Sequence, residues 1–157
     1  MSSSIEQIKQ EINAKIRPMI ESDYCTLEEF LYHAAYVPKG GEAYERDIIY
    51  EPNNYVYIKD FGTQTGDLGV VAEVDGKVVG AAWGRILPVY GFVDPTLPFV
   101  VGSMLPPFRG LGIGRKMLDE YFQVLKVNGY TQISGRMKWL RMFKATEFPE
   151  IKAWYEL

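Results

Sequence analysis

Apolar and polar positions follow a β-type pattern most clearly in the middle of the chain. The runs LGVVAEV (68–74) and KVVGAAWGRIL (77–87) are rich in β-branched residues and flank the dipeptide Asp75-Gly76. An Asp-Gly dipeptide between two such runs favours a two-residue turn, because both turn residues must adopt a positive φ. The middle of the chain therefore predicts a β-hairpin.

The region after the hairpin predicts a strand and then a helix. The run FVVGSML (99–105) is almost wholly apolar, which indicates a central strand that ends before Pro106 and Pro107. From Gly112 to Val127 the apolar positions recur at helical spacing, and Gly129 is suited to the C-terminal stop. The apolar stripe of this helix comprises Ile113, Met117, Tyr121, Val124 and Leu125.

The flanking regions carry weaker patterns. Residues 1–14 predict a helical lead-in, and the following AKIRPMI predicts a short strand. A helix is expected over residues 21–36, with Ser22 or Asp23 as its N-cap. Residues 37–66 lack a clear period, which indicates short helices or a functional loop.

After Gly129 the pattern predicts a strand, a short helix and a last strand. The expected order is then β-α-loop-β-β-β-α-β-α-β. This order is an α/β (α+β) fold with a mixed, mostly antiparallel central sheet flanked by helices. A length of 157 residues fits a single domain over residues 1–157.

Composition limits the classes of function. Seventeen basic and twenty acidic side chains give a net charge of −3, which argues against a nucleic-acid partner held by overall charge. With Cys25 as the only cysteine and His33 as the only histidine, no metal is expected. We interpret Cys25 as an incidental thiol and His33 as a packed or surface side chain. The chain has no pattern of a secretory signal or a membrane span, so we expect a cytoplasmic protein without a membrane partner.

The stretch PFRGLGIGRK (107–116) places three glycines at alternate positions between Arg109 and Arg115, at the expected start of a helix. The first N–H groups of a helix have no partners within it and lie at the positive end of its dipole. Glycines leave these donors accessible and the arginines add positive charge, so a pyrophosphate is the natural ligand.

Two of the three known phosphate motifs fail on this stretch. A P-loop needs Gly-Lys followed by Ser or Thr, and Gly114 is followed by Arg115. A dinucleotide fingerprint needs a third glycine at position 115 and strands joined by crossovers, whereas the chain predicts a hairpin. The pattern Arg-x-x-Gly-x-Gly, from Arg109 to Gly114, is the one that matches.

In its context, MLPPFRGLGIGRKML resembles the acetyl-CoA signature of the GNAT superfamily of acyl-CoA-dependent N-acetyltransferases. The hairpin VVAEVDGKVVGAAWGRI resembles the second and third strands of that family, and IRPMIESDY its opening strand and first helix. The stretch RDIIYEPNNYVYIKDFG further resembles a bacterial subgroup of the family. The resemblance spans roughly residues 15 to 157.

This resemblance implies acetyl-CoA as the co-substrate. Backbone N–H groups of residues 110–115 would hold the pyrophosphate, and the strand end 103–105 would pair with the pantetheine arm like an added strand. The Met104 N–H would polarise the thioester carbonyl. The implied cofactor-binding residues are Ser103, Met104, Leu105, Arg109, Gly110, Leu111, Gly112, Ile113, Gly114 and Arg115.

The resemblance breaks at the catalytic groups. The tyrosine that commonly protonates the leaving thiolate is replaced by Phe143, and the asparagine before it by Met137. No carboxylate lies in the run 99–105 to act as base. No catalytic residue can be assigned. Glu51, Asp60 and Trp83 are candidates for the substrate side, with surface positions as the alternative for the two acids and core packing favoured for Trp83.

We therefore expect an N-acetyltransferase that transfers an acetyl group from acetyl-CoA to an amine by direct attack. The acceptor could be a small amine, an amino acid derivative or a peptide N-terminus. The alternative is a non-catalytic acyl-CoA-binding sensor or partner module, and a weaker one is a scaffold with a vestigial site. The sequence leaves open whether the chain forms a homodimer.

Overall fold

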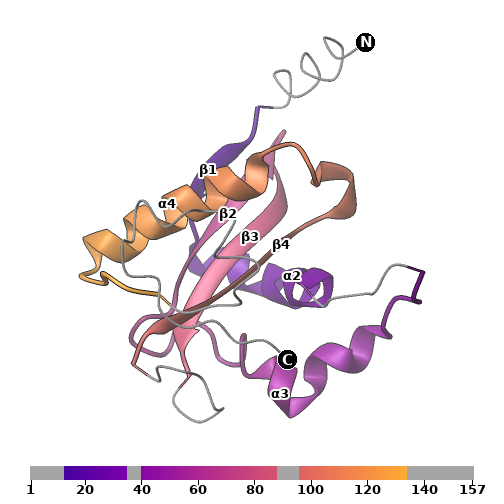
Figure 1. The fold of residues 1–157 in the computed structure, drawn as a ribbon, viewed down its shortest axis with the longest axis horizontal. Coiled ribbons are helices and arrows are strands. Elements are labelled where there is room, and N and C mark those ends of the chain that lie inside the picture. The colour runs from indigo at the N-terminus through magenta and orange to yellow at the C-terminus, as the bar shows by residue number, and fades with distance from the viewer. Residues whose placement is uncertain (1–12, 35–39, 88–95, 134–157) are drawn as a thin grey trace.

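A computed structural model of the chain describes residues 13–34, 40–87 and 96–133. Within these ranges, four strands form one antiparallel sheet in the order β1-β2-β3-β4 (Figure 1). The strands are β1 (Lys15–Pro18), β2 (Leu68–Val74), β3 (Lys77–Ile86) and β4 (Pro98–Met104). The predicted mixed α/β fold with a mostly antiparallel sheet is confirmed.

The hairpin between β2 and β3 forms where the sequence predicts it. Asp75 and Gly76 have φ values of 52° and 76°, which a two-residue hairpin turn of type I′ requires. One register shift interrupts the pairing between Ala72 and Glu73. This bulge lies near the turn and leaves the pairing of β3 with β4 regular.

Helices of two kinds cover the sheet. The α-helices are α2 (Leu27–Ala34), α3 (Pro52–Tyr55) and α4 (Ile113–Val127), and the 3-10 helices are η1 (Glu21–Thr26), η2 (Arg46–Tyr50) and η3 (Pro106–Phe108). The irregular region thus contains short helices, as predicted, and α4 begins and ends within one residue of its predicted bounds.

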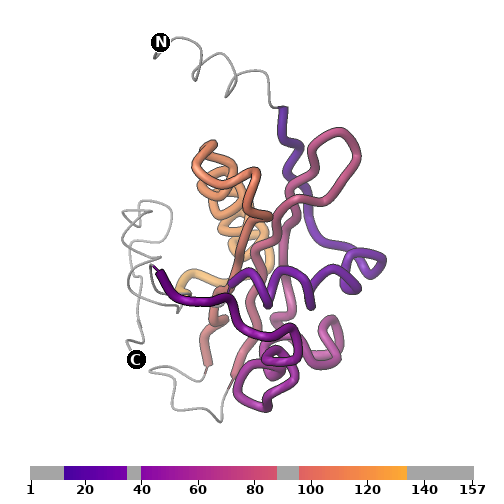
Figure 2. The backbone as a smooth tube through the Cα atoms, turned by 90° about the vertical axis from the view of Figure 1, so that its right-hand side faces the viewer, coloured from indigo at the N-terminus to yellow at the C-terminus, as the bar shows by residue number. Residues whose placement is uncertain are grey.

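Two hydrophobic cores lie on the two faces of the sheet. Alternate residues of a strand point to opposite faces. Val70 and Ala72 accordingly pack with α4, whereas Val71 packs with α2. Figures 1 and 2 show α4 (orange) and the segment 40–66 (purple) on different sides of the strands. Ile113, Met117, Tyr121 and Leu125 of the predicted apolar stripe are buried, and Val124 is half-buried.

The start of the first helix differs from its prediction. Neither Ser22 nor Asp23 is the N-cap, because η1 begins earlier, at Glu21. Asp23 lies inside the first turn, where its carboxylate accepts the Ile20 N–H (2.8 Å) and two hydrogen bonds from the Arg17 guanidinium (2.7 and 2.9 Å).

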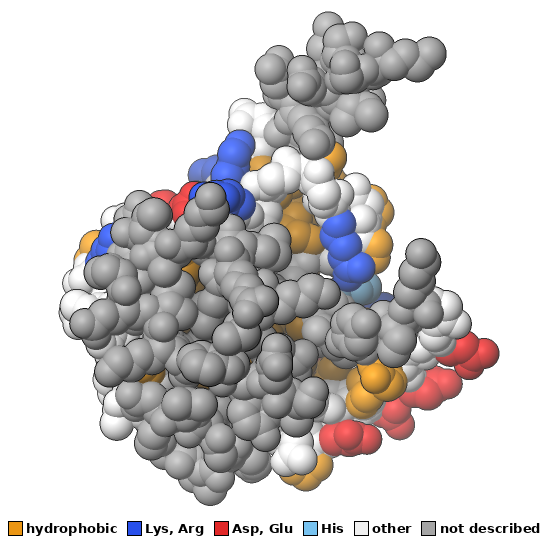
Figure 3. Space-filling view, in the orientation of Figure 1, with side chains coloured by type: hydrophobic (Ala, Val, Ile, Leu, Met, Phe, Trp, Pro, Cys, Tyr) orange, Lys and Arg blue, Asp and Glu red, His pale blue; other side chains and the backbone are white. Residues whose placement is uncertain are grey.

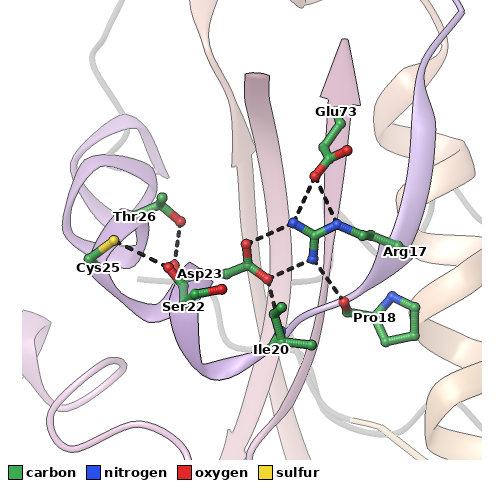
Figure 4. A network of polar contacts seen from close by, with 8 residues as sticks. All are labelled: Arg17, Pro18, Ile20, Ser22, Asp23, Cys25, Thr26 and Glu73. Carbon is green, nitrogen blue, oxygen red and sulfur yellow. Dashed lines mark hydrogen bonds and ion pairs between the residues drawn. The ribbon is translucent and has the colours of Figure 1, made fainter. Parts of the chain in front are cut away.

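Arg17 also donates from Nε to Glu73 (2.8 Å), so one guanidinium joins β1, β2 and η1 (Figure 4). Its hydrogen bonds lower the pKa of the Asp23 carboxyl and raise the pKa of Arg17. Glu73 is half-buried in this network. The network fixes the start of the helical layer to the sheet edge.

Several predictions fall on segments outside the described residues. These are the helical lead-in, the elements after residue 133, and the extent of the single domain, which stay predictions. The central position of β4 belongs with them, because within the described part of the chain β4 pairs with β3 alone. None of the helices in the described ranges has the length and apolar character needed to cross a membrane.

Candidate functional site

At the C-terminal end of β4, the backbone N–H and C=O of Met104 point away from β3. The Leu105 N–H donates to the Val79 carbonyl (2.9 Å), so Leu105 faces β3. In an antiparallel pair the backbone groups of successive residues point to opposite edges, so Ser103 also faces β3 and Met104 faces the other edge. Of the three strand-end residues predicted to bind the cofactor, Met104 alone presents its backbone groups outward.

Arg109 confirms this direction of the Met104 backbone. Its Nε donates to the Met104 carbonyl oxygen (3.1 Å), and its Nη2 lies 3.5 Å from the His33 carbonyl oxygen at the end of α2. The exposed guanidinium therefore lies between the end of β4 and the last turn of α2, next to the glycine turn. It places a fixed positive charge beside the outward-facing backbone.

The glycine turn is built around two left-handed residues. Gly110 and Gly112 have φ values of 76° and 81°, a conformation that costs other residues about 1–2 kcal/mol. A Cβ at Gly110, Gly112 or Gly114 would meet no atom within 4 Å. Packing against the described residues therefore does not require these glycines, and these residues leave space over the turn.

The first turn of α4 has the wrong charges for its own stability. Its N-cap, Gly112, has no side chain to cap the helix, and the first turn contains no acid. Arg115 and Lys116 stand there instead, although cations are disfavoured at the positive end of a helix dipole. The first intrahelical bond runs from the Lys116 N–H to the Gly112 carbonyl (3.4 Å), beyond the N–H groups of Ile113 and Gly114. An anion bound here would accept hydrogen bonds from the N–H groups of Ile113 and Gly114.

Helix α2 runs alongside β4 toward this turn. The Ser103 hydroxyl donates to the Phe30 carbonyl (2.6 Å), and one helical turn later the His33 carbonyl meets Arg109. The C-terminal end of α2 thus lies over the C-terminal end of β4. The strand end, the glycine turn and the end of α2 form one site, hereafter the β4–α4 site.

The predicted substrate-side residues are two exposed acids and one buried tryptophan. Glu51 is exposed at the N-cap of α3, and Asp60 is exposed in a turn with φ 53°. Trp83 has no exposed surface, and its indole N–H donates to the Tyr57 carbonyl (3.1 Å), as the packing interpretation expects. The two acids occupy the surface positions of the alternative interpretation.

Sequence analysis missed Arg85, the residue that holds the segment 56–67 on the sheet. Arg85 is buried and donates to the Val56 and Lys59 carbonyls (3.1 and 2.6 Å) and to both oxygens of Asp67. The Asp67 carboxylate also accepts the Gly62 and Gln64 N–H groups. An arginine on a strand that is otherwise apolar was the signal that could have identified it.

No three His, Cys, Asp or Glu side chains of the described ranges gather in a way that could hold a metal.

The chain matches the family model of the acetyltransferase (GNAT) family over residues 28–140. A comparison with curated proteins finds no match.

The fold is similar to three solved acetyltransferases. One is the aminoglycoside N-acetyltransferase AAC(6')-Iy in complex with CoA (TM-score 0.56, 14% identity, 93% of each chain covered). The second is a GNAT family acetyltransferase from Brucella melitensis in complex with acetyl-CoA (TM-score 0.53, 19% identity, 93% of this chain and 97% of that chain). The third, from an uncultured soil metagenomic sample, is the aminoglycoside acetyltransferase meta-AAC0020 in complex with sisomicin (TM-score 0.53, 16% identity, 92% and 95%). These similarities establish the fold, while the match of the family model establishes that the chain belongs to the acetyltransferase (GNAT) family.

Proposed function

We propose that this protein is an acetyl-CoA-dependent N-acetyltransferase that uses the β4–α4 site. The observation that carries the proposal is the start of α4, which has no side-chain cap and no acid in its first turn, and where a Cβ on any of three glycines would meet no atom within 4 Å. Such a turn lowers the stability of the free helix and suits a bound pyrophosphate. Two solved structures of similar fold are complexes with CoA or acetyl-CoA, which supports the same ligand here.

The residues divide the work between binding and activation. The N–H groups of residues 110–115 would hold the pyrophosphate, with Arg109 adding its charge. Acetyl-CoA supplies the activated acetyl group. The outward-facing Met104 N–H would donate to the acetyl oxygen as negative charge develops there, a contribution of about 10²–10³ in rate for one such donor in other enzymes. Ser103 and Leu105 would position this donor through their bonds to α2 and β3.

Charge supports an amine acceptor. Residues 40–51 contain four acids and one arginine, and all four acids are exposed: Glu42, Glu45, Asp47 and Glu51. Figure 3 shows acidic side chains gathered along one edge of the face it presents. Negative potential raises the local concentration of a cationic amine. One relative was solved with sisomicin, which supports a small-molecule acceptor over a peptide amine.

A calorimetric titration with CoA and acetyl-CoA tests cofactor binding. We expect both to bind the wild type and binding to be lost in Arg109→Glu. Lys77→Glu is the matched control, because it reverses an exposed charge at the β2–β3 turn. Equal binding by Arg109→Glu and the wild type would place the ligand elsewhere. No binding to folded wild type would leave the scaffold interpretation.

A turnover assay separates the enzyme from the alternative, a non-catalytic acyl-CoA-binding module. The replacement of the usual tyrosine by Phe143 favours that alternative. Release of CoA thiol would be followed with acetyl-CoA and a panel of amines: spermidine, sisomicin, an amino acid amide and a peptide with a free α-amine. Acetylation of any of these supports the enzyme, whereas binding without acetylation supports the module.

A further inference from the structure

The only histidine of the chain forms a hydrogen-bonded pair with a carboxylate. His33 Nε2 lies 2.9 Å from Glu29 Oε1, one helical turn earlier on α2, and 15% of the His33 side chain is exposed. Glu29 also accepts two hydrogen bonds from Arg46, one of them 3.2 Å long. The Arg46 guanidinium lies 4.1 Å from the centre of the Tyr32 ring. The Glu29 carboxylate is therefore held between His33 and an arginine that is itself packed on a ring.

This pairing selects one tautomer of the imidazole. The hydrogen bonds from Arg46 lower the pKa of the Glu29 carboxyl, so Glu29 is ionised at neutral pH and can only accept. A neutral His33 must then carry its hydrogen on Nε2, which leaves the lone pair of Nδ1 as a proton acceptor. A carboxylate that orients a histidine in this way is the arrangement of a general base.

The backbone of His33 lies at the β4–α4 site. The His33 carbonyl contacts Arg109 Nη2, and Nε of the same guanidinium binds the Met104 carbonyl. The Arg109 side chain therefore connects His33 on α2 with Met104, whose N–H would polarise the acetyl group. The imidazole and this N–H belong to adjoining backbone segments that share one partner.

We propose that His33, oriented by Glu29, is the general acid–base residue of the acetyl transfer. The proposal rests on the proposed function. The acceptor first releases its ammonium proton to water and attacks as the neutral amine. As the acceptor nitrogen forms its bond to the acetyl carbon, it loses a second proton to His33 Nδ1. The carbon–sulfur bond then breaks, and the sulfur leaves as a thiolate that takes this proton from the imidazolium. His33 returns to its neutral form, and the products are an amide and CoA thiol.

One residue in both roles accounts for the two groups that the chain lacks. The position of the usual acid holds Phe143, and the run 99–105 has no carboxylate to serve as base. An imidazole is neutral when it accepts the proton and cationic when it donates it, so it can serve both steps near neutral pH.

Charges of both signs act on His33. Within the described residues, Glu29 binds the ring, Arg46 of η2 binds Glu29, and Arg109 contacts the backbone of His33. The aromatic neighbour is Tyr32, whose ring centre lies 5.4 Å from that of His33.

The first test is the turnover assay with acetyl-CoA and the amine panel, on wild type, His33→Gln and Glu29→Gln. We expect kcat to fall by about 10²-fold or more in His33→Gln and by less in Glu29→Gln, with CoA affinity unchanged. The wild type and His33→Gln should both lose kcat/KM on the acid side because the acceptor amine is protonated there, but the wild type should depend on one proton more than His33→Gln does. Tyr50→Phe is the control, because it removes a hydrogen bond to Glu28, next to Glu29.

A second measurement needs neither an acceptor nor a variant. Because the chain has one histidine, its imidazole nitrogen signals in a ¹⁵N NMR spectrum need no assignment. We expect the tautomer with the hydrogen on Nε2, and a change in these signals when acetyl-CoA is added.

The outcomes separate the two proposals. A wild type that acetylates an amine together with an equally active His33→Gln overturns the role of His33 alone. The opposite tautomer also overturns it, even if His33→Gln fails to fold. A wild type that binds acetyl-CoA and acetylates no amine overturns the proposed enzyme and the role of His33 together.

Discussion

The carboxylate of Asp67 and the guanidinium of Arg85 form a two-point ion pair inside the protein, with bonds of 3.1 and 2.9 Å. Only 3% of the Arg85 side chain and 1% of the Asp67 side chain are exposed. Arg85 lies on β3, whereas Asp67 ends the turn that follows α3. The pair therefore fixes the segment before β2 to the sheet, on the face that carries α2.

Breaking this pair should destabilise the protein strongly. In Asp67→Asn the Arg85 charge stays buried without its counter-charge, which typically costs about 3–5 kcal/mol. Urea denaturation should show this loss of unfolding free energy. The control is Asp60→Asn, at an exposed position with positive φ that asparagine tolerates, where we expect a change within about 0.5 kcal/mol. A similar small effect for both variants would contradict a structural role for the ion pair.

The Arg17–Asp23 pair should make stability depend on pH in the acid range. Hydrogen bonds from Arg17 hold the pKa of Asp23 below its usual 3.8, so folding favours the ionised form. This contribution is complete above about pH 4 and is lost as the pH falls through the folded-state pKa. Asp23→Asn should lower the unfolding free energy by about 1–3 kcal/mol at pH 7 and by less at pH 3.

The measurement is a series of denaturation curves between pH 2.5 and pH 7, with buffers spaced about half a unit apart across the usual carboxyl range. Glu21→Gln is the control, because Glu21 is an exposed acid of the same 3-10 helix. Parallel pH curves for wild type and Asp23→Asn would rule out the proposed linkage.

The elements that the sequence predicted well depend on local signals. The hairpin follows from Asp75-Gly76 and its two flanking runs, and α4 follows from apolar spacing between two glycines. Turn chemistry and helical periodicity act over a few residues, so a single sequence displays them. The same holds for the glycine turn, whose left-handed φ values only glycine adopts readily.

The features that the sequence did not predict depend on contacts between distant segments. The local pattern favours Asp23 as a helix cap, whereas the structure pairs its carboxylate with Arg17 on β1. The sequence does not show that Asp67 neutralises Arg85, because the two residues meet only when strands β2 and β3 pair. The pairing of His33 with Glu29 matches helical spacing, but its approach to Arg109 appears only once α2 packs on β4.

The hydroxyl of Tyr121 occupies the space beside Gly84, so substitutions at the two positions should depend on each other. The Tyr121 hydroxyl is buried and has no hydrogen-bond partner in the described structure, and a Cβ at Gly84 would overlap it. Burial raises the pKa of this phenol, which therefore stays neutral. Gly84→Ala should cost about 1–3 kcal/mol through overpacking.

Removal of the hydroxyl should reverse this cost. Tyr121→Phe alone should be neutral or stabilising, because it removes an unsatisfied polar atom, and the double variant should recover most of the loss of Gly84→Ala. Thermal unfolding of the four proteins completes the cycle. Destabilisation by Tyr121→Phe of more than about 1 kcal/mol would mean that the hydroxyl does find a partner.

The last prediction separates stability from ligand binding within the glycine turn. Gly114 lies in the first turn of α4 without a positive φ, and a methyl group there would meet no neighbour. Gly114→Ala should therefore leave the stability unchanged or raise it by up to about 1 kcal/mol, because alanine is the better helix former. The same methyl group would stand among the N–H donors of the proposed pyrophosphate site. Loss of one charge-assisted hydrogen bond, about 1.5–3 kcal/mol, should weaken CoA binding about 10- to 100-fold.

The control for this variant is Gly76→Ala, at the β2–β3 turn. Gly76 has φ 76° and an equally open Cβ position, so the variant should lose about 1–2 kcal/mol of stability through backbone strain while binding CoA normally. Calorimetry and thermal unfolding on both variants give two effects in opposite directions. If Gly114→Ala binds CoA as tightly as wild type, the N–H groups at the start of α4 do not contact the ligand, and the proposed site is wrong.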